Sequence, residues 1–163
     1  VDMGIALVPE GRRLFPNLTV RENLLLGAYR LAARPARAKN LEFCFHAFPA
    51  LADRQKQLAG SMSGGEQQMV AIARAFMSAP KILVVDEPSV GLSPIMVKQV
   101  ISKIDELKVA HGLTVLMAEQ NFNQAIRIAD RGYVMVQGQV AFEGMDAAEL
   151  RDNDFVRKAY LGV

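Results

Sequence analysis

Four consecutive apolar residues, Ile82 to Val85, are followed directly by two adjacent carboxylates, Asp86 and Glu87. An unbroken apolar run of this length is typical of a strand buried on both faces of a parallel sheet. A second such run, at 113–118, follows the next helical segment. Strand and helix patterns therefore alternate from Ser63 to about Val136, and this alternation predicts an α/β fold built from βαβ units.

Several helix starts are marked by residues that can bond to the free backbone N–H groups of the first turn. Thr19 and Ser63 are each followed three residues later by a glutamate, which is the capping-box pattern. Ser93 is followed by Pro94, and Gly112 offers a helix stop. We expect a helix after each of the three caps. The other elements expected are a strand at 5–8, helices at 36–48 and 121–129, a hairpin around 137–139 and a helix after Asp146.

Composition excludes several classes of protein. The chain has 163 residues, 51% of them hydrophobic and 22% charged, which suits one globular domain and argues against disorder. A net charge of +2 is too small to indicate nucleic-acid binding. The single cysteine, Cys44, rules out an intrachain disulfide, and we interpret it as a small packed residue. No apolar run approaches the roughly 18 residues that a membrane helix needs.

Polar residues follow three of the expected strands. They are Glu10, the pair Asp86 and Glu87, and Gln120. Ligands of open α/β sheets bind beyond the carboxyl ends of the strands. Neighbours in an extended chain point to opposite faces, so one carboxylate of the pair can hold a magnesium ion while the other orients a water for attack on a phosphate. The alternative is a charged strand end before a turn at Pro88.

The hexapeptide that starts with Ser63 has an unusual first helical turn. A capping box explains Ser63 and Glu66, but it does not explain Gly64 and Gly65. Each glycine costs about 1 kcal/mol of helix propensity relative to alanine. Glycines at a helix start leave backbone N–H groups and the positive end of the helix dipole open to an anion. The pattern predicts a phosphate-binding helix start, with an ordinary capped helix as the alternative.

Together these motifs resemble the ABC-type ATPase family, whose fold is a P-loop NTPase core with a helical subdomain. Ser63 to Gln67 is similar to the family's signature motif, with Met62 in place of the usual leucine. Ile82 to Ser89 is similar to its Walker B strand and the start of its D-loop. Further likenesses narrow the resemblance to an ATPase subunit of branched-chain amino-acid importers; the matching subunit of urea importers shares much of this pattern. Those likenesses lie at 8–16, 18–24, 91–94 and 118–121.

The resemblance implies ATP and Mg²⁺ as ligands and a role for each site residue. Asp86 would hold the metal together with Glu10, which stands at the position of the family's Q-loop glutamine. Glu87 would polarise the attacking water, and Gln120 would stand at the position of the switch histidine. A neutral amide there cannot carry a proton as histidine can. The residues implied to contact nucleotide are Ser63, Gly64, Gly65, Glu66, Glu10 and Ser93, the last standing where many members have the D-loop aspartate.

The resemblance also divides the chain and implies its partners. Residues 1–16 would form the Q-loop strand and loop, 17–61 the helical subdomain that meets the membrane subunit, and 62–163 the rest of the ATPase core. The partners implied are a second ABC ATPase subunit, identical or different, and integral membrane permease subunits, with no nucleic acid. The location implied is the cytoplasmic face of the membrane. We interpret Arg12 and Arg13 as part of a solvated loop, with contact to a phosphate or to the membrane partner as the alternative.

One motif of the family is not present in this sequence. No G-x-x-x-x-G-K-(S/T) segment occurs, so the Walker A loop that cradles phosphates is lacking. In the family that loop, and the internal strand before it, precede the position matching Val1. We therefore expect the chain to be the C-terminal two-thirds of a longer ATPase, and its own enzymatic activity stays an open question.

Three functions are left open by this reading. The first is the subunit that binds and hydrolyses ATP in an importer, driving transport by dimer closure on the membrane subunits. The second is a soluble ABC ATPase of translation or DNA repair, although the paired cassettes, coiled-coil insertions or basic arms usual there are not visible. The third is an inactive truncated remnant that still docks on a membrane partner through residues 17–60. The sequence does not indicate the solute.

We expect the 163-residue chain, purified alone, to bind ATP poorly, to aggregate, and to show no magnesium-dependent ATP turnover. The physical reason is the lack of the phosphate-cradling loop and the open strand edges left without an interior strand. Phosphate release measured beside a Glu87→Gln variant checks this expectation. Robust turnover that the variant abolishes would contradict it.

Overall fold

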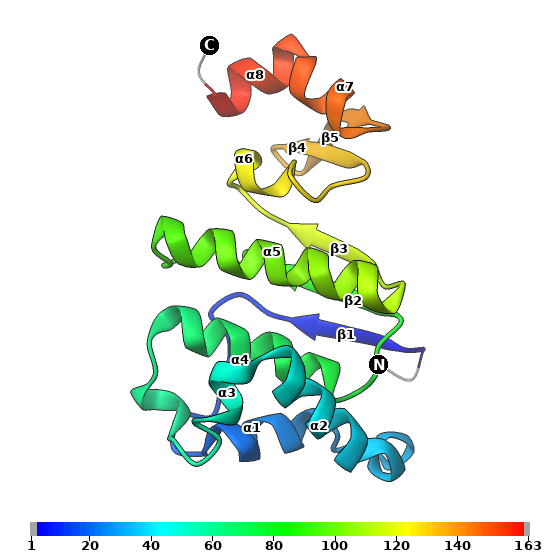
Figure 1. Cartoon of the computed structure of the whole chain (residues 1–163). Helices are drawn as coiled ribbons and strands as arrows, with labels where there is room; N and C mark the ends of the chain where they lie inside the picture. The colour runs from blue at the N-terminus through cyan, green and yellow to red at the C-terminus, as the bar shows by residue number, and fades with distance from the viewer. Residues whose placement is uncertain (1–2, 162–163) are drawn as a thin grey trace. The chain divides into compact units, whose positions relative to one another are not determined.

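A computed structural model describes the backbone of residues 3–161 and, apart from positions 31, 32 and 159–161, their side chains. The chain forms two compact units, Val1–Ala118 and Glu119–Val163, which are described separately below (Figure 1). The division by motif into 1–16, 17–61 and 62–163 stays a prediction. Among the described residues, no helix combines the length and apolarity needed to cross a membrane.

The first unit contains a three-stranded parallel sheet. Its strands are β1 (Ile5–Val8), β2 (Ile82–Asp86) and β3 (Thr114–Ala118), in the order β1-β2-β3. Val8 pairs with Val85, and Asp86 pairs with Ala118, so the carboxyl ends of the three strands lie at one edge. The predicted parallel sheet is confirmed, and with it the convergence of polar strand ends that follow β1 and β2.

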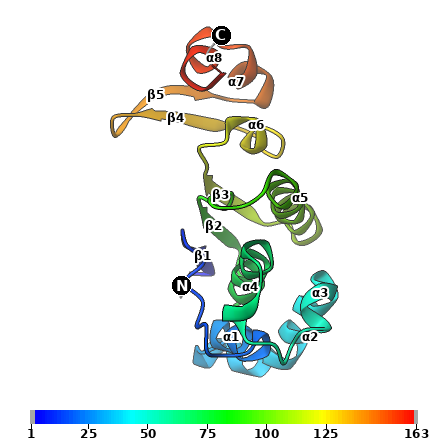
Figure 2. The ribbon, with the colours of Figure 1, turned by 90° about the vertical axis from the view of Figure 1, so that its left-hand side faces the viewer.

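The sheet is covered by helices on one face. Helices α4 (Gly64–Phe76) and α5 (Pro94–His111) both lie on that face (Figure 2). Leu83 and Val85 are fully buried, whereas Leu7 and Leu116 on the other face are 58% and 61% exposed. The prediction that residues 82–85 would be buried on both faces is wrong. The helices of this unit that the structure describes pack on one face only, so burial alternates along β2.

The capping residues place the helices as the sequence predicts. Helix α1 (Val20–Gly27) begins after Thr19, whose Oγ1 accepts from the Glu22 N–H at 3.2 Å, while the Glu22 carboxylate accepts from the Thr19 N–H at 2.8 Å. Hydrogen bonds from the Thr19 side chain and backbone hold the pKa of Glu22 below its usual value. Helix α5 ends at Gly112, which takes the left-handed conformation with φ of 58°.

The remaining helices of this unit are short. Helix α2 (Arg37–Ala47) is preceded by a 3₁₀ turn at Leu31–Ala36, which contains Pro35. Helix α3 (Pro49–Ala52) and a 3₁₀ turn at Ala59–Ser61 follow it. The helix expected at 36–48 is therefore confirmed within one or two residues at its ends.

A buried asparagine fixes the loop between β1 and α1. The Asn23 side chain is fully buried and donates to the carbonyls of Phe15 and Leu18 at 3.0 and 3.2 Å. Its Oδ1 accepts from the Phe15 N–H at 2.9 Å. Because these bonds satisfy the loop's polar groups away from water, they hold the chain that leads from β1 to α1 in one conformation.

Helix α1 packs unusually close to α4. A Cβ added at Gly27 would lie 1.9 Å from the backbone oxygen of Arg74 and 2.9 Å from Cβ of Met77. Only glycine permits this approach, because the obstructing oxygen belongs to the backbone of α4 and has no rotamer to change. The core beside it contains Leu24, Ile72 and Met77, all fully buried.

The described residues of the second unit form a hairpin and three helices. It contains α6 (Phe122–Ala125), β4 (Gly132–Val136), β5 (Gln139–Gly144), α7 (Ala147–Asp152) and α8 (Asp154–Leu161). Gln137 and Gly138 turn the hairpin with φ of 50° and 79°, the signs that a type I′ turn requires. The predicted hairpin and the cap at Asp146 are confirmed. Its buried cluster consists of Ile126, Val134, Leu150 and Val156.

The helix predicted at 121–129 is much shorter in the structure. Only Phe122–Ala125 is α-helical. Beyond it, the N–H groups of Arg127 and Ile128 donate to carbonyls three residues back, at 3.3 and 3.2 Å. These are 3₁₀-type bonds, so the chain continues as a tight turn that ends the helix early.

Replacing Gly27 with alanine is expected to lower the free energy of unfolding by about 1–3 kcal/mol, the usual cost of overpacking. Helix propensity alone would change it in the opposite direction, by up to about 1 kcal/mol. Urea unfolding measures the difference. Gln99→Ala, at an exposed position of α5, is the matched control and should change stability by less than about 0.5 kcal/mol. An unchanged or raised stability of Gly27→Ala would show that α1 and α4 are less closely packed.

Cys44 is fully buried, and its thiol donates to the carbonyl of Ala73 at 3.2 Å. The interpretation of Cys44 as a packed residue is confirmed. Burial raises the pKa of the thiol from its ordinary 9.0 to about 12. We expect a thiol reagent at pH 8 to label the native chain roughly a thousandfold more slowly than the urea-unfolded chain, since the thiolate is the reactive form and the pKa is about three pH units higher in the folded chain. Equal rates would contradict this burial.

The same pKa sets a pH dependence of stability. The folded chain keeps the Cys44 proton until the pH nears 12, whereas the unfolded chain loses it near 9.0. The stabilisation from this group is therefore complete below pH 9 and declines as the pH rises from 9 toward 12. Comparing the urea midpoints of the native chain and Cys44→Ala across this pH range isolates the effect. Parallel pH profiles would contradict it.

Candidate functional site

Three carboxylates lie at the carboxyl edge of the parallel sheet. Glu10 follows β1 by two residues, Asp86 ends β2, and Glu87 comes next. Glu10 and Asp86 are exposed, and the Glu87 N–H donates to the carbonyl of Ala118 at 2.9 Å. The parallel register thus places all three where the sequence predicts them, at the edge at which ligands of α/β sheets bind.

Glu87 is strained and incompletely bonded. Its backbone is left-handed, with φ of 45°. That conformation costs a residue with a side chain about 1–2 kcal/mol. Its Oε2 is buried without a hydrogen-bond partner among the described residues. A buried unpaired polar group costs about 1–3 kcal/mol, and such groups cluster where a ligand or water completes the site.

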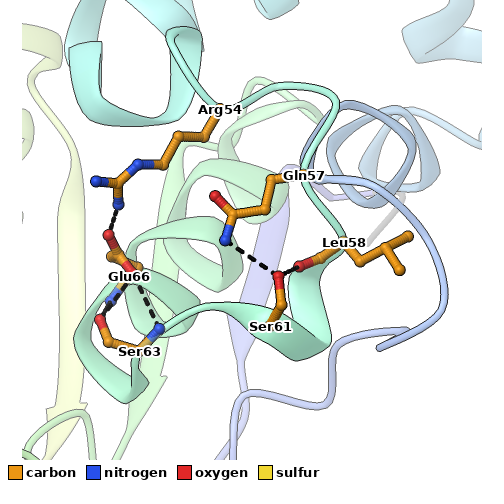
Figure 3. A network of polar contacts seen from close by, with 6 residues as sticks. All are labelled: Arg54, Gln57, Leu58, Ser61, Ser63 and Glu66. Atoms are coloured by element: carbon orange, nitrogen blue, oxygen red, sulfur yellow. Dashed lines mark hydrogen bonds and ion pairs between the residues drawn. The ribbon is translucent and has the colours of Figure 1, made fainter.

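Ser63 caps α4 and shares its hydrogen bonds with Glu66. The Glu66 Oε2 accepts from the Ser63 N–H at 2.9 Å and from the Ser63 hydroxyl at 2.8 Å, while Ser63 Oγ accepts from the Glu66 N–H at 3.4 Å (Figure 3). The predicted capping box is confirmed. The other carboxylate oxygen of Glu66, Oε1, forms an ion pair with Arg54. Nothing in the sequence pattern marks Arg54, which lies in the segment between two short helical elements.

The two glycines of α4 have a packing role that sequence reasoning missed. A Cβ at Gly64 would lie 3.1 Å from Nη2 of Arg12, and one at Gly65 would lie 2.1 Å from Cε of Met96. Ser63 is exposed, Gly64 is half-buried and Gly65 is buried. The glycines therefore let Arg12 and α5 approach the helix start, in addition to leaving its N–H groups without a covering side chain.

The loop after β1 reaches this helix start. Arg12 is half-buried, its Nη2 donates to the carbonyl of Val90 at 3.4 Å, and its Nε is buried without a hydrogen-bond partner in the described structure. The interpretation as a solvated loop therefore agrees with the exposed Arg13 but not with the half-buried Arg12. Gly11, Arg12 and Arg13 are all left-handed, with φ of 70°, 66° and 45°. This strained turn was not foreseen.

Arg74 of α4 holds the strained turn. Its guanidinium donates to the carbonyls of Arg13 and Arg12 at 2.8 and 3.0 Å. Desolvation by burial lowers the pKa of Arg74. Arg74 therefore has a structural role, because its single side chain satisfies two carbonyls of an otherwise unfavourable turn.

The other predicted site residues are placed as follows. Ser93 caps α5, with its Oγ accepting from the Met96 N–H at 3.4 Å. A Cβ at Gly64 would also lie 3.5 Å from Leu92, so the turn before α5 adjoins the start of α4. Gln120 is exposed and belongs to the second unit. The described residues bring together no cluster of three or more side chains of the metal-binding types.

Comparisons with known proteins agree with this arrangement. The family model described as ABC transporter matches residues 1–90, which is more than half of the chain. The chain is 48% identical to the high-affinity branched-chain amino acid transport ATP-binding protein BraG of Pseudomonas aeruginosa, over 97% of the chain. It is 37% identical, over 99% of its length, to the probable branched-chain amino acid transport ATP-binding protein LivF of Archaeoglobus fulgidus. The chain belongs to the ABC transporter family.

Solved structures confirm the predicted fold. The cbiO1 protein of Clostridium perfringens, part of the ABC transporter complex cbiONQ, superposes with a TM-score of 0.80 at 24% identity over 98% of the chain. An ATP-binding cassette of an ABC transporter in its ADP conformation gives 0.77 at 28% identity, also over 98%. The chain spans 66% and 67% of the two relatives named above, and 64% and 69% of the two solved chains.

Proposed function

We propose that the protein acts as the ATP-binding and ATP-hydrolysing subunit of an importer for branched-chain amino acids. The observation that carries this proposal is Glu87, which combines a left-handed backbone with a buried, unpaired carboxylate oxygen at the carboxyl edge of the sheet. A carboxylate held in this way is suited to accept a hydrogen bond from an attacking water and to orient it toward a phosphate.

Asp86 and Glu10 are the residues that would hold magnesium. Both carboxylates are exposed. Asp86 precedes Glu87 in the sequence, and Glu10 follows β1, the strand paired with β2. Mg²⁺ is usually bound by one or two carboxylates together with phosphate oxygens. The ion, when bound, supplies positive charge that offsets the charge developing on the phosphate. The lysine-bearing phosphate loop is not in this sequence, so the residues proposed here orient the water, hold the metal and serve the partner's nucleotide.

The start of α4 would bind the γ-phosphate of an ATP molecule held by a second ATPase subunit. Ser63 is exposed and lies at the positive end of a 13-residue helix, and Gly64 leaves its first turn without a side chain. Gly65 would contribute its backbone N–H only, and Ser93 caps the neighbouring helix. Gln120 keeps its proposed position as the amide counterpart of the switch histidine.

A groove on the helical segment is the observation that favours docking on a membrane partner. It has a volume of about 470 Å³ and is lined by Leu25, Leu26, Ala28, Tyr29, Arg34 and Arg37. Tyr29 is 64% exposed, and exposed aromatic and apolar side chains beside arginines are typical of protein-binding surfaces. We propose that permease subunits dock there, which would place the protein at the cytoplasmic face of the membrane.

The choice of solute depends on the relatives. Three proteins named for branched-chain amino acid transport are 48%, 37% and 31% identical to the chain. Relatives named for phosphonate or thiamine import, or for lipopolysaccharide export, are 30–36% identical. The 48% identity is well above that to the relatives named for these other solutes, and it favours a branched-chain amino acid, although this subunit class does not itself contact the solute.

Glu87→Gln is expected to lower kcat for ATP by at least about a hundredfold, because an amide cannot accept the proton of the attacking water. KM should change little, since Gln keeps the shape of the side chain. The assay uses the protein at the length its source encodes, assembled with its membrane subunits in liposomes. Phosphate release and leucine uptake are measured together.

Glu42→Gln, at an exposed position of α2, is the matched control and should retain the activity of the unmodified protein. Equal turnover by Glu87→Gln and the control would refute the role of Glu87. ATP turnover that leucine uptake does not accompany would refute the solute and leave the ATPase.

A further inference from the structure

The carboxylate of Glu66 connects Ser63 to a cation from another segment. Its Oε2 takes both donors of Ser63, at 2.9 and 2.8 Å, and its Oε1 pairs with Arg54 (Figure 3). The guanidinium, the carboxylate and the hydroxyl therefore form one continuous chain of polar contacts. It runs from the segment after α3 to the first residue of the α4 cap.

The segment that contributes Arg54 is held in place by its own bonds. The Gln57 N–H donates to the Arg54 carbonyl at 2.8 Å. The Gln57 side chain donates to the Ser61 hydroxyl at 3.0 Å, and that hydroxyl donates to the Leu58 carbonyl at 2.8 Å (Figure 3). The Val20 N–H of α1 donates to the Gln57 carbonyl at 2.9 Å. Arg54 thus projects from a bonded scaffold, and its position does not depend on the ion pair alone.

Glu66 creates an electrostatic problem for the proposed function. If Ser63 and the first N–H groups of α4 serve a phosphate, a carboxylate only 2.8 Å from the Ser63 hydroxyl places a like charge beside that phosphate. The Ser63 hydroxyl also donates to Glu66 in this structure, so its single proton must turn away before it can serve another acceptor.

We infer that Arg54 is a positioning residue that compensates the charge of Glu66 and so makes the Ser63 end of α4 able to accept a phosphate. When the Ser63 hydroxyl turns away from Glu66, Arg54 still pairs with Oε1 of Glu66, and the Ser63 N–H still donates to Oε2. This inference rests on the proposed function, because it concerns the phosphate served by the same helix start.

A purely structural role predicts different behaviour. The Arg54 and Glu66 side chains are 46% and 26% exposed, and ion pairs at such sites contribute little to stability. Loss of a structural contact would change the unfolding midpoint. Loss of charge compensation would change the nucleotide concentration needed for binding, more at low ionic strength than at high, because salt screens the uncompensated carboxylate.

The test uses the protein at the length its source encodes. The variants are Arg54→Gln, Arg54→Lys, Glu66→Gln and the double variant Arg54→Gln/Glu66→Gln. Lys56→Gln removes the same charge from an exposed position two residues away and is the matched control. The readouts are dimerisation driven by a slowly hydrolysed ATP analogue, followed by analytical ultracentrifugation, and KM for ATP. Unfolding midpoints are measured alongside.

We expect Arg54→Gln to raise the half-maximal analogue concentration about tenfold at low salt, the order expected for one uncompensated charge near a surface site. The rise should shrink to about threefold or less at 0.5 M salt. The double variant should return to within about twofold of Glu66→Gln, because it removes the charge of the carboxylate. Arg54→Lys should be nearly normal, because it keeps a cation beside Glu66.

Each contrary result has a defined meaning. If Arg54→Gln matches Lys56→Gln while the unmodified protein dimerises with nucleotide, this inference is wrong and the proposed function stands. If the double variant is no better than Arg54→Gln, Arg54 has a structural role and the inference is also overturned. If the unmodified protein neither dimerises with the analogue nor turns over ATP, the proposed function and this inference both fail.

Discussion

The assembly of the first unit depends on close packing around α4. Its last turns accept donors from two neighbouring segments: Asn40 bonds to the Met77 carbonyl at 3.0 Å, and the Cys44 thiol bonds to the Ala73 carbonyl at 3.2 Å. Gly27 allows α1 to contact the same turns directly. Its other end, at Ser63, is shaped by Glu66 and by the glycines that admit α5. Several segments, including the strained loop that Arg74 holds, therefore depend on the position of this one helix.

Local rules account for most of the elements. The caps at Thr19, Ser63 and Ser93 are short-range interactions that depend on residues within one helical turn, so the sequence predicts them well. The same holds for the hairpin, where the turn itself requires positive φ. The length of α6 was overestimated because apolar spacing alone does not distinguish an α-helix from a 3₁₀ turn of the same residues. Burial of β2 was overestimated because a strand's own residues do not reveal how many layers cover it.

The candidate site was predicted in part. The site residues at the ends of β1 and β2 and at the start of α4 belong to short contiguous motifs, which are visible in the sequence. A parallel register is then enough to bring the two strand ends together. The contributions of Arg12, Arg54 and Arg74 depend on contacts between segments far apart in the chain, and no pattern within one segment signals them. The left-handed conformations of Arg12, Arg13 and Glu87 were equally unpredictable. Side chains other than glycine adopt them only when tertiary contacts impose the conformation.

The one-sided covering of the sheet has a thermodynamic consequence. Leu7 and Leu116 present apolar surface on the face opposite α4 and α5. Removing such surface from water is favourable by about 25 cal/mol per Å². Any segment or molecule that binds this face of the folded form and does not bind the unfolded chain shifts the folding equilibrium by mass action. The stability of this unit therefore depends on what binds the exposed face, and it would depend on protein concentration only if the binding molecule were a second copy of the chain.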